Sequence, residues 1–143
     1  MMYTFIISRL IISALLGFLI GIERDRVHKE AGIRTMSLVA LGTTLFTLLS
    51  IYGLANTDID YDPTRIMSNV VTGIGFLGAG IIIFHGERVH NMTTAATIWV
   101  MAGIGMAVGM GWYIPAVAVT LLTLIILITV RVLNLEEKIG KKV

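Results

Sequence analysis

The sequence alternates five long apolar runs with short polar stretches. The runs cover about Tyr3 to Ile22, Thr35 to Leu54, Pro63 to Phe84, Met92 to Gly111 and Pro115 to Leu133. A helix needs about 20 mainly apolar residues to cross a bilayer, and each run has about that length. The sequence therefore predicts an all-α integral membrane protein, a bundle of five transmembrane helices in one domain, residues 1–143.

Composition agrees with a chain that lies in lipid. Hydrophobic residues make up 56% and charged residues 14% of the sequence, against about 45–50% and 25% in soluble domains. Five spans leave no room for a soluble catalytic domain, and the sequence contains no catalytic triad or Walker loop. We therefore expect no enzymatic activity and no cofactor. The net charge of +2 is too small to indicate a nucleic-acid partner.

The basic residues predict how the helices are oriented. Lysine and arginine accumulate in cytoplasmic segments. One side of the predicted bundle collects Arg24, Arg26, Lys29, Arg34, Arg88, Arg131, Lys138, Lys141 and Lys142, and the other side collects only Arg9 and Arg65. This distribution predicts an N-terminus outside, a cytoplasmic C-terminus, and a multi-pass protein of a bacterial inner membrane.

The first run places a charge on a stripe of small residues. Arg9, Ser13, Gly17 and Gly21 follow at spacings of four, so they share one helix face. Small residues let helices approach closely in a membrane. An intramembrane charge usually faces the protein interior, so Arg9 is a candidate polar anchor or part of an ion path. The other interpretation is that Arg9 reaches the headgroups from near the helix end.

The third run is rich in glycine. On a helical wheel, Gly73 and Gly80 share one face, and Gly75 and Gly78 lie roughly opposite. Two flat faces predict that this helix lies at the centre of the bundle. Unwinding of the glycine segment to expose carbonyl groups to a cation is the alternative. The Gly-x-Gly-x-x-Gly spacing is not a dinucleotide site here, because it lies inside an apolar span.

Two further features concern helix starts and metal binding. Asp62 followed by Pro63 predicts a capped start of the third helix, and Asn91 or Thr93 can cap the fourth. Asp58, Asp60 and Asp62 alternate along one loop, so they are weak candidates for a magnesium or calcium contact. The other interpretation is an acidic loop that is exposed to solvent and binds no metal.

Two segments leave their roles open. The mixed-charge stretch from Glu23 to Arg34 can fix the topology and contact anionic lipid, or it can dock another membrane protein. The pairs Gly17-x-x-x-Gly21 and Gly105-x-x-x-Gly109 can pack helices within one chain or between two chains.

The sequence resembles the N-terminal membrane domain of the bacterial MgtC/SapB family. The resemblance runs in order through Arg9-Leu10 to Gly21-Ile22-Glu23-Arg24, Ala31-Gly32-Ile33-Arg34-Thr35, Asp62-Pro63-Thr64-Arg65, the glycine segment 73–80 and Thr93-Thr94-Ala95-Ala96-Thr97-Ile98-Trp99. Within these motifs, the polar and aromatic residues that the family pattern marks are Arg9, Glu23, Arg24, Arg34, Thr35, Arg65, Thr93, Thr94 and Trp99. Virulence-associated members carry a soluble C-terminal domain, whereas only ten residues follow Leu133 here, so we expect a short form.

The resemblance implies a protein linked to growth at low magnesium that modulates other membrane machinery, such as transport ATPases or ATP synthase. From it and the small-residue motifs we expect a lipid-embedded homo-oligomer, a dimer first, with other membrane proteins as further partners. The alternative is a small ion transporter or channel with a path along the first and third helices. Against that alternative, no acidic residue lies within a predicted span to receive a cation.

Overall fold

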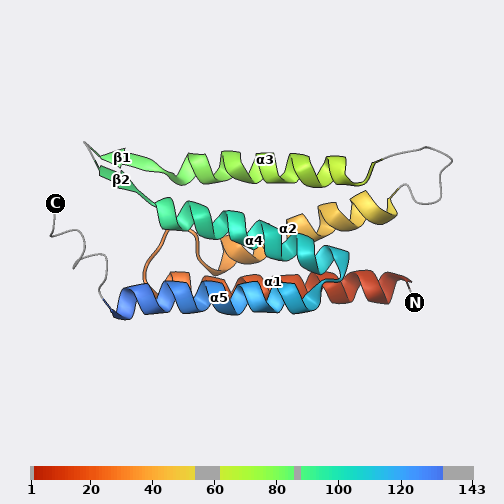
Figure 1. The fold of residues 1–143 in the computed structure, drawn as a ribbon, viewed down its shortest axis with the longest axis horizontal. Coiled ribbons are helices and arrows are strands. Elements are labelled where there is room, and N and C mark those ends of the chain that lie inside the picture. The colour runs from red at the N-terminus through yellow and green to blue at the C-terminus, as the bar shows by residue number, and fades with distance from the viewer. Residues whose placement is uncertain (1, 54–61, 86–87, 134–143) are drawn as a thin grey trace.

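The computed structural model describes residues 2–53, 62–85 and 88–133. Its elements are α1 (Met2–Arg26), α2 (Ile33–Tyr52), α3 (Thr64–Ile81), β1 (Ile83–His85), β2 (Arg88–His90), α4 (Met92–Met110) and α5 (Tyr113–Val132). The two strands pair antiparallel, Ile83 opposite His90. The five helices lie alongside one another, and the short hairpin projects from one end (Figure 1). We call this the hairpin end.

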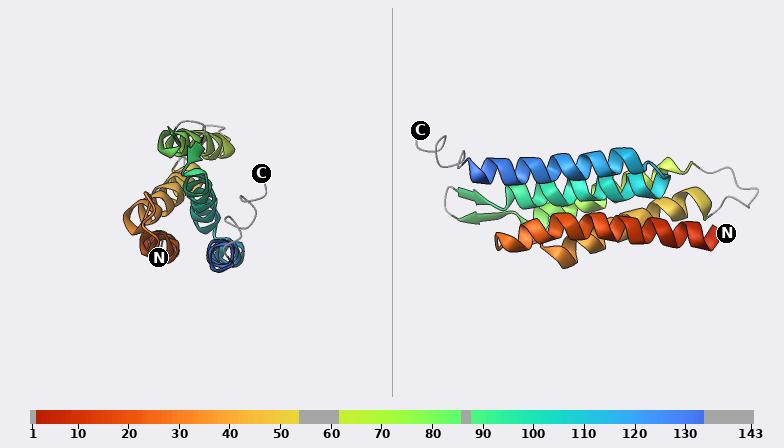
Figure 2. Two further views of the ribbon diagram at one scale, coloured as in Figure 1. Left: turned by 90° about the vertical axis from the view of Figure 1, so that its left-hand side faces the viewer. Right: turned by 90° about the horizontal axis from the view of Figure 1, so that it is seen from below.

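The helices form layers around α2 and α4. Seen along the bundle, α3 lies on one side of this central pair, and α1 and α5 lie on the other (Figure 2). The buried core follows this order, since it takes residues mainly from α1, α2 and α4, among them Ile20, Met36, Ile98, Met101 and Ile104. Helices α2 and α4 are therefore the central helices of the bundle.

Small residues explain why α2 is central. A Cβ added at Gly17 of α1 would lie 2.6 Å from the Met36 carbonyl oxygen, and one at Gly105 of α4 would lie 2.6 Å from the Ala40 carbonyl oxygen. The Thr44 hydroxyl also donates a 2.7 Å hydrogen bond to the Gly105 carbonyl. Both Gly-x-x-x-Gly pairs thus pack α1 and α4 against α2. Packing within one chain was one of their two predicted roles.

The prediction that the third helix is central is wrong. Within α3 only Ile74 and Gly78 are buried. A Cβ at Gly78 would lie 3.6 Å from that of Ala95 on α4, whereas one at Gly73, Gly75 or Gly80 would meet nothing within 4 Å. The α3 residues that contact the central pair are thus few, and most of the helix, including the apolar Phe76, is exposed. The helix is also continuous from Thr64 to Ile81, so the predicted unwinding is not seen.

The start of α3 agrees in part with the predicted cap, because Asp62 bonds to Thr64 but the N-cap position is Pro63. Asp62 Oδ1 accepts hydrogen bonds from the Thr64 backbone N–H at 2.8 Å and from its hydroxyl at 2.7 Å. The Thr64 hydroxyl and N–H, together with the charge of Arg65, lower the pKa of Asp62. Pro63 already has helical dihedrals, although the helix is assigned from Thr64.

Other boundaries differ locally from the prediction. α1 continues one turn beyond Ile22, to Arg26, and the region predicted as the end of the third helix and a polar turn contains the hairpin. Asn91 precedes α4 in a left-handed conformation and makes no side-chain cap. Its amide instead donates to the Ile81 carbonyl at 3.2 Å, so Asn91 ties the start of α4 to the end of α3.

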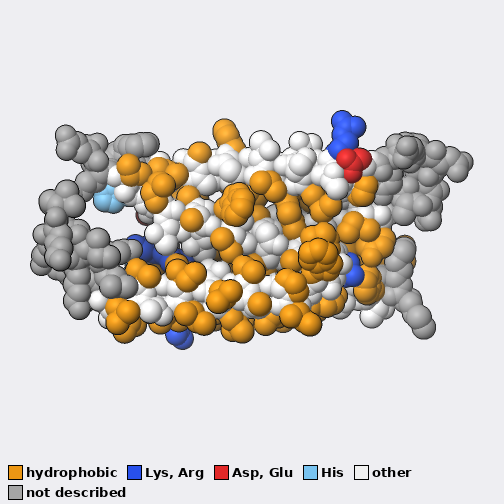
Figure 3. Space-filling view, viewed as in Figure 1, with side chains coloured by type: hydrophobic (Ala, Val, Ile, Leu, Met, Phe, Trp, Pro, Cys, Tyr) orange, Lys and Arg blue, Asp and Glu red, His pale blue; other side chains and the backbone are white. Residues whose placement is uncertain are grey.

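The outer surface of the bundle is apolar. Hydrophobic side chains cover the face in Figure 3 along the helices, and charged side chains lie toward the two ends. Helices α1, α2, α4 and α5 are long and apolar enough to cross a membrane. α3 is not among them, because its polar Arg65, Ser68, Asn69 and Thr72 and its glycines lower its hydropathy.

Candidate functional site

Arg9 is buried and joins α1 to the end of α4. It is 6% exposed. One guanidinium nitrogen donates to the Gly109 carbonyl, and Nε donates to the Tyr113 hydroxyl at 3.3 Å. The guanidinium carbon also lies 3.8 Å from the centre of the Phe5 ring. The side chain points into the protein, as the first of the two interpretations of Arg9 predicted, and does not extend to solvent.

The position of Arg9 follows from how α4 ends. The last carbonyls of a helix lack intrahelical donors and carry partial negative charge. Gly111 has φ +85° and closes α4 with its N–H on the Ala107 and Val108 carbonyls. Arg9 supplies the donor for Gly109, and a Cβ at Gly111 would lie 2.5 Å from Arg9 Nη2. Arg9 is thus a second, long-range cap of α4.

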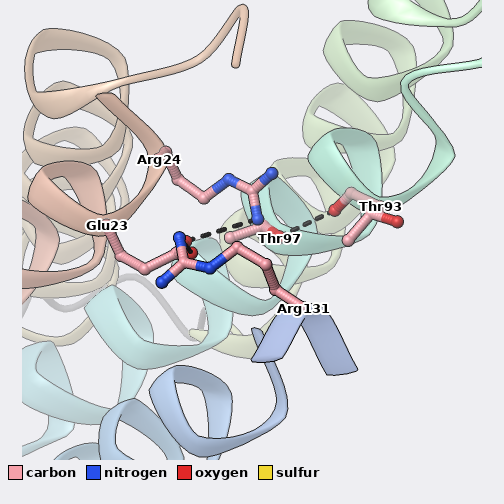
Figure 4. A network of polar contacts seen from close by, with 5 residues as sticks. All are labelled: Glu23, Arg24, Thr93, Thr97 and Arg131. Atoms are coloured by element: carbon pink, nitrogen blue, oxygen red, sulfur yellow. Dashed lines mark hydrogen bonds and ion pairs between the residues drawn. The ribbon is translucent and has the colours of Figure 1, made fainter. Parts of the chain in front are cut away.

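A second polar group lies at the hairpin end (Figure 4). Glu23 and Arg24, in the last turns of α1, are 6% and 3% exposed. Arg131 of α5 donates from Nη1 to Glu23 Oε1 at 3.1 Å, and Arg24 Nη1 lies 3.4 Å from Glu23 Oε2. Isolated buried charges are very costly, so such a carboxylate requires partners. Glu23 therefore holds two arginines of different helices together.

This group lines a cavity of about 750 Å³ between α1, β2, α4 and α5. The lining residues are Glu23, Arg24, Val27, Lys29, Val89, His90, Asn91, Met92, Thr93, Thr94, Ile126, Leu127, Val130 and Arg131. One wall is charged, one is the first turn of α4, and the α5 wall is largely aliphatic. This is the polar site that the tertiary structure assembles.

The first turn of α4 opens into this cavity. Ala95 makes the first intrahelical bond, to the Asn91 carbonyl, so the N–H groups of Met92, Thr93 and Thr94 have no acceptor within α4. Thr94 is 1% exposed, and its hydroxyl bonds to no residue that the structure describes. The hydroxyl of Thr97, one turn further along α4, donates a 2.7 Å hydrogen bond to the Thr93 carbonyl.

The structure groups only some of the predicted site residues. Glu23, Arg24, Thr93 and Thr94 meet at the hairpin end, whereas Arg9 lies at the opposite end. Arg34, Arg65 and Trp99 are exposed and separate, and Thr35 lines a shallow groove between α2 and α3. Asp58 and Asp60 lie outside the described residues, so the metal contact with Asp62 stays a prediction.

Arg131 is a site residue that sequence reasoning missed. It was counted only as one of the basic residues that set topology. Its place in the last turn of an apolar helix, at the same predicted membrane level as Glu23, was the available signal. The pairing itself depends on how α1 and α5 pack, which the sequence pattern does not specify.

Long apolar helices with lipid-type surfaces, joined by buried polar groups near their ends, define a multi-pass membrane protein. The sequence matches the MgtC family over residues 10–135. Since this match covers most of the chain, the protein belongs to the MgtC family.

Curated relatives agree with this assignment. Over 137 residues the chain is 41% identical to the protein of Escherichia coli (strain K12) named "Putative magnesium transporter YhiD", with 90% of this chain and 64% of the relative covered. It is 43% identical over 124 residues to Protein MgtC of Salmonella typhimurium (strain LT2), covering 87% of this chain and 51% of the relative. An uncharacterized protein of Haemophilus influenzae is 37% identical over 139 residues, covering 93% and 57%.

The chain thus spans between about half and two thirds of the length of these relatives. No solved structure matches it.

Proposed function

We propose that this protein is a non-enzymatic accessory protein of the bacterial inner membrane that adapts other membrane machinery, such as transport ATPases or ATP synthase, to low magnesium. In this proposal all five helices span, and the hairpin end faces the cytoplasm because most basic residues gather there. Family membership supports the link to magnesium. The observation that carries the accessory role is the structural use of Arg9.

An ion path requires its charged groups to face an open route. The charge of Arg9 is held by the Gly109 carbonyl, the Tyr113 hydroxyl and the Phe5 ring. Between Arg9 and Glu23, the inner face of α1 buries Ser13, Leu16 and Ile20. This packing supports a structural role for Arg9 over a conducting one.

The alternative path along the first and third helices meets a second obstacle. α1 and α3 lie on opposite sides of the α2–α4 pair (Figure 2). A Cβ at Gly73, Gly75 or Gly80 of α3 meets nothing within 4 Å, so these glycines do not pack against α1. A route between α1 and α3 would therefore require more than one protomer. Support for the transporter alternative comes from the name of the YhiD relative.

The decisive experiment measures transport and regulation separately. Purified protein in proteoliposomes is expected to give no magnesium or anion flux above empty vesicles. The same protein, expressed in a strain that lacks its MgtC-family proteins, should restore growth at low magnesium and change the rate of ATP synthesis in its membrane vesicles. Magnesium flux abolished in an Arg9→Ala protein that is still folded would establish transport and overturn the proposal.

The outward face of α3 supports assembly into a homo-oligomer, with a dimer as the simplest form. Arg65, Ser68 and Thr72 are exposed and follow one another at helical spacing. The Ser68 and Thr72 hydroxyls bond to carbonyls of their own helix, but the charge of Arg65 is costly next to lipid tails. Glycines also allow a second helix to approach closely. A second copy of the chain would cover this face.

Gly75→Leu is expected to weaken self-association without unfolding the protomer. A Cβ at Gly75 meets nothing within 4 Å in the protomer, but a leucine there would block close helix contact between copies. Gly103→Leu on α4 is the matched control, because its site is equally open within the protomer. Crosslinking in membranes should lose the dimer band with the first variant only, and equal dimer yields would contradict the proposed interface.

A further inference from the structure

The hairpin-end cavity joins three features that converge on one kind of ligand. Besides the Glu23–Arg24 pair, its described lining contains the cations Lys29 and Arg131, so positive charge predominates among the described lining residues. Arginine binds planar oxyanions such as phosphate through paired N–H groups. The cavity therefore favours an anion over a metal cation.

The first turn of α4 lines the same cavity and adds backbone donors. The N–H groups of Met92, Thr93 and Thr94 lack intrahelical acceptors, and the Asn91 amide is used on the Ile81 carbonyl. Free N–H groups and the helix dipole together make a helix N-terminus attractive to phosphate. Backbone donors and guanidinium groups thus approach the cavity from different elements.

Two side-chain oxygens at the cavity add observations on groups other than the backbone N–H groups. The Thr94 hydroxyl lines the cavity in a residue that is 1% exposed, and it bonds to none of the residues that the structure describes. Glu23 Oε2 is also buried without a hydrogen-bond donor, although Arg24 lies 3.4 Å away. Buried polar atoms are rarely left unsatisfied. Thr94 can donate to a phosphate oxygen, and Glu23 can accept from a hydroxyl on the same ligand.

We propose that the hairpin-end cavity binds a phosphate group, held by Arg131, Lys29, the Thr94 hydroxyl and the free N–H groups of α4. Glu23 keeps the arginines in place and accepts a hydrogen bond from a hydroxyl of the ligand. The aliphatic wall of Ile126, Leu127 and Val130 fits the acyl chains of a phospholipid. Inorganic phosphate offers the same oxyanion without the chains. This site does not depend on whether the protein regulates or transports.

The test is calorimetric titration of the purified full chain in a phosphate-free, non-ionic detergent. The probes are dihexanoyl phosphatidylglycerol, inorganic phosphate, and dihexanoyl glycerol as a lipid lacking the phosphate. Binding of at least one phosphate probe, without binding of dihexanoyl glycerol, is expected. Lipid binding alone identifies a headgroup as the ligand, and binding of both probes identifies the phosphate itself as sufficient. Binding of neither phosphate probe would overturn the proposal.

Three variants locate the site. Arg131→Gln and Lys29→Gln are each expected to weaken binding roughly tenfold or more, and Thr94→Val several-fold, because hydrogen bonds to charged groups are strong. Lys29 is exposed and Thr94→Val conserves shape, so these two keep the test valid if Arg131→Gln loses stability through Glu23. Thermal denaturation of each variant verifies its folding.

Two controls separate a built site from general surface charge. Arg26→Gln removes a cation from the same end of α1, at an exposed position that does not line the cavity. Thr120→Val removes a buried hydroxyl on α5 that is already bonded to the Ala116 carbonyl. Both should bind the probes as the parent protein does. A loss with Arg26→Gln equal to that with Lys29→Gln would show nonspecific attraction and sink the proposal.

Discussion

Gly105→Ala is expected to lower the free energy of unfolding by about 1–3 kcal/mol, the usual effect of forcing an extra group into a packed core. The added Cβ would lie 2.6 Å from the Ala40 carbonyl oxygen and would also meet the Thr43 hydroxyl. Thr43 can rotate, but the α2 backbone cannot move without separating α2 from α4. Such separation would also stretch the 2.7 Å bond from Thr44 to Gly105.

The same helix provides the control. Gly103 lies two residues earlier, and a Cβ there meets nothing within 4 Å. Gly103→Ala should be neutral or stabilising by up to about 1 kcal/mol, since alanine favours helix more than glycine. Unfolding in detergent micelles, followed by circular dichroism against denaturant, compares the two. Equal stability of the two variants would show that α2 and α4 do not approach each other as closely as described.

Arg9→Ala is expected to lower the free energy of unfolding by about 3 kcal/mol. The Gly109 carbonyl would lose its donor, which costs about 1–3 kcal/mol when the group is buried. The contact with the Phe5 ring adds about 1 kcal/mol or more away from water. The end of α4 would also lose a positive charge close to its partial negative charge.

Arg26→Ala is the control for Arg9→Ala. Arg26 belongs to the same helix but is exposed, and exposed substitutions usually change stability by no more than about 0.5 kcal/mol. The denaturation midpoint of the protein in micelles should fall for Arg9→Ala and stay near the parent value for Arg26→Ala. An Arg9→Ala protein as stable as the parent would mean that the capping contact to Gly109 contributes little to the fold.

The two Gly-x-x-x-Gly pairs and Arg9 show which contacts the spacing of residues along the chain can predict. Spacing places Ser13, Gly17 and Gly21 on one face together with Arg9, and the structure buries all of them. Spacing cannot name the helix that this face meets, because any helix can pack on a stripe of small residues. In the structure both glycine pairs pack against α2, so these motifs join helices within one chain.

The third helix shows the opposite result. Its glycines predicted a central position, but Gly73, Gly75 and Gly80 are open in the protomer. A glycine allows close approach and does not require it. The more reliable signal in α3 was its division into an apolar face and a polar face, with Ile74 buried and Arg65, Ser68 and Thr72 exposed.

The sequence by itself determined the helical class, the approximate spans and the family, because these follow from local composition, hydrophobic run length and ordered motifs. Only the tertiary structure decided which helices are central and how the polar residues are grouped. It placed Arg9 on the end of α4, and it paired Glu23 of α1 with Arg131 of α5. Those contacts link positions about 100 residues apart, and they depend on how the helices pack, which the pattern along one helix does not record.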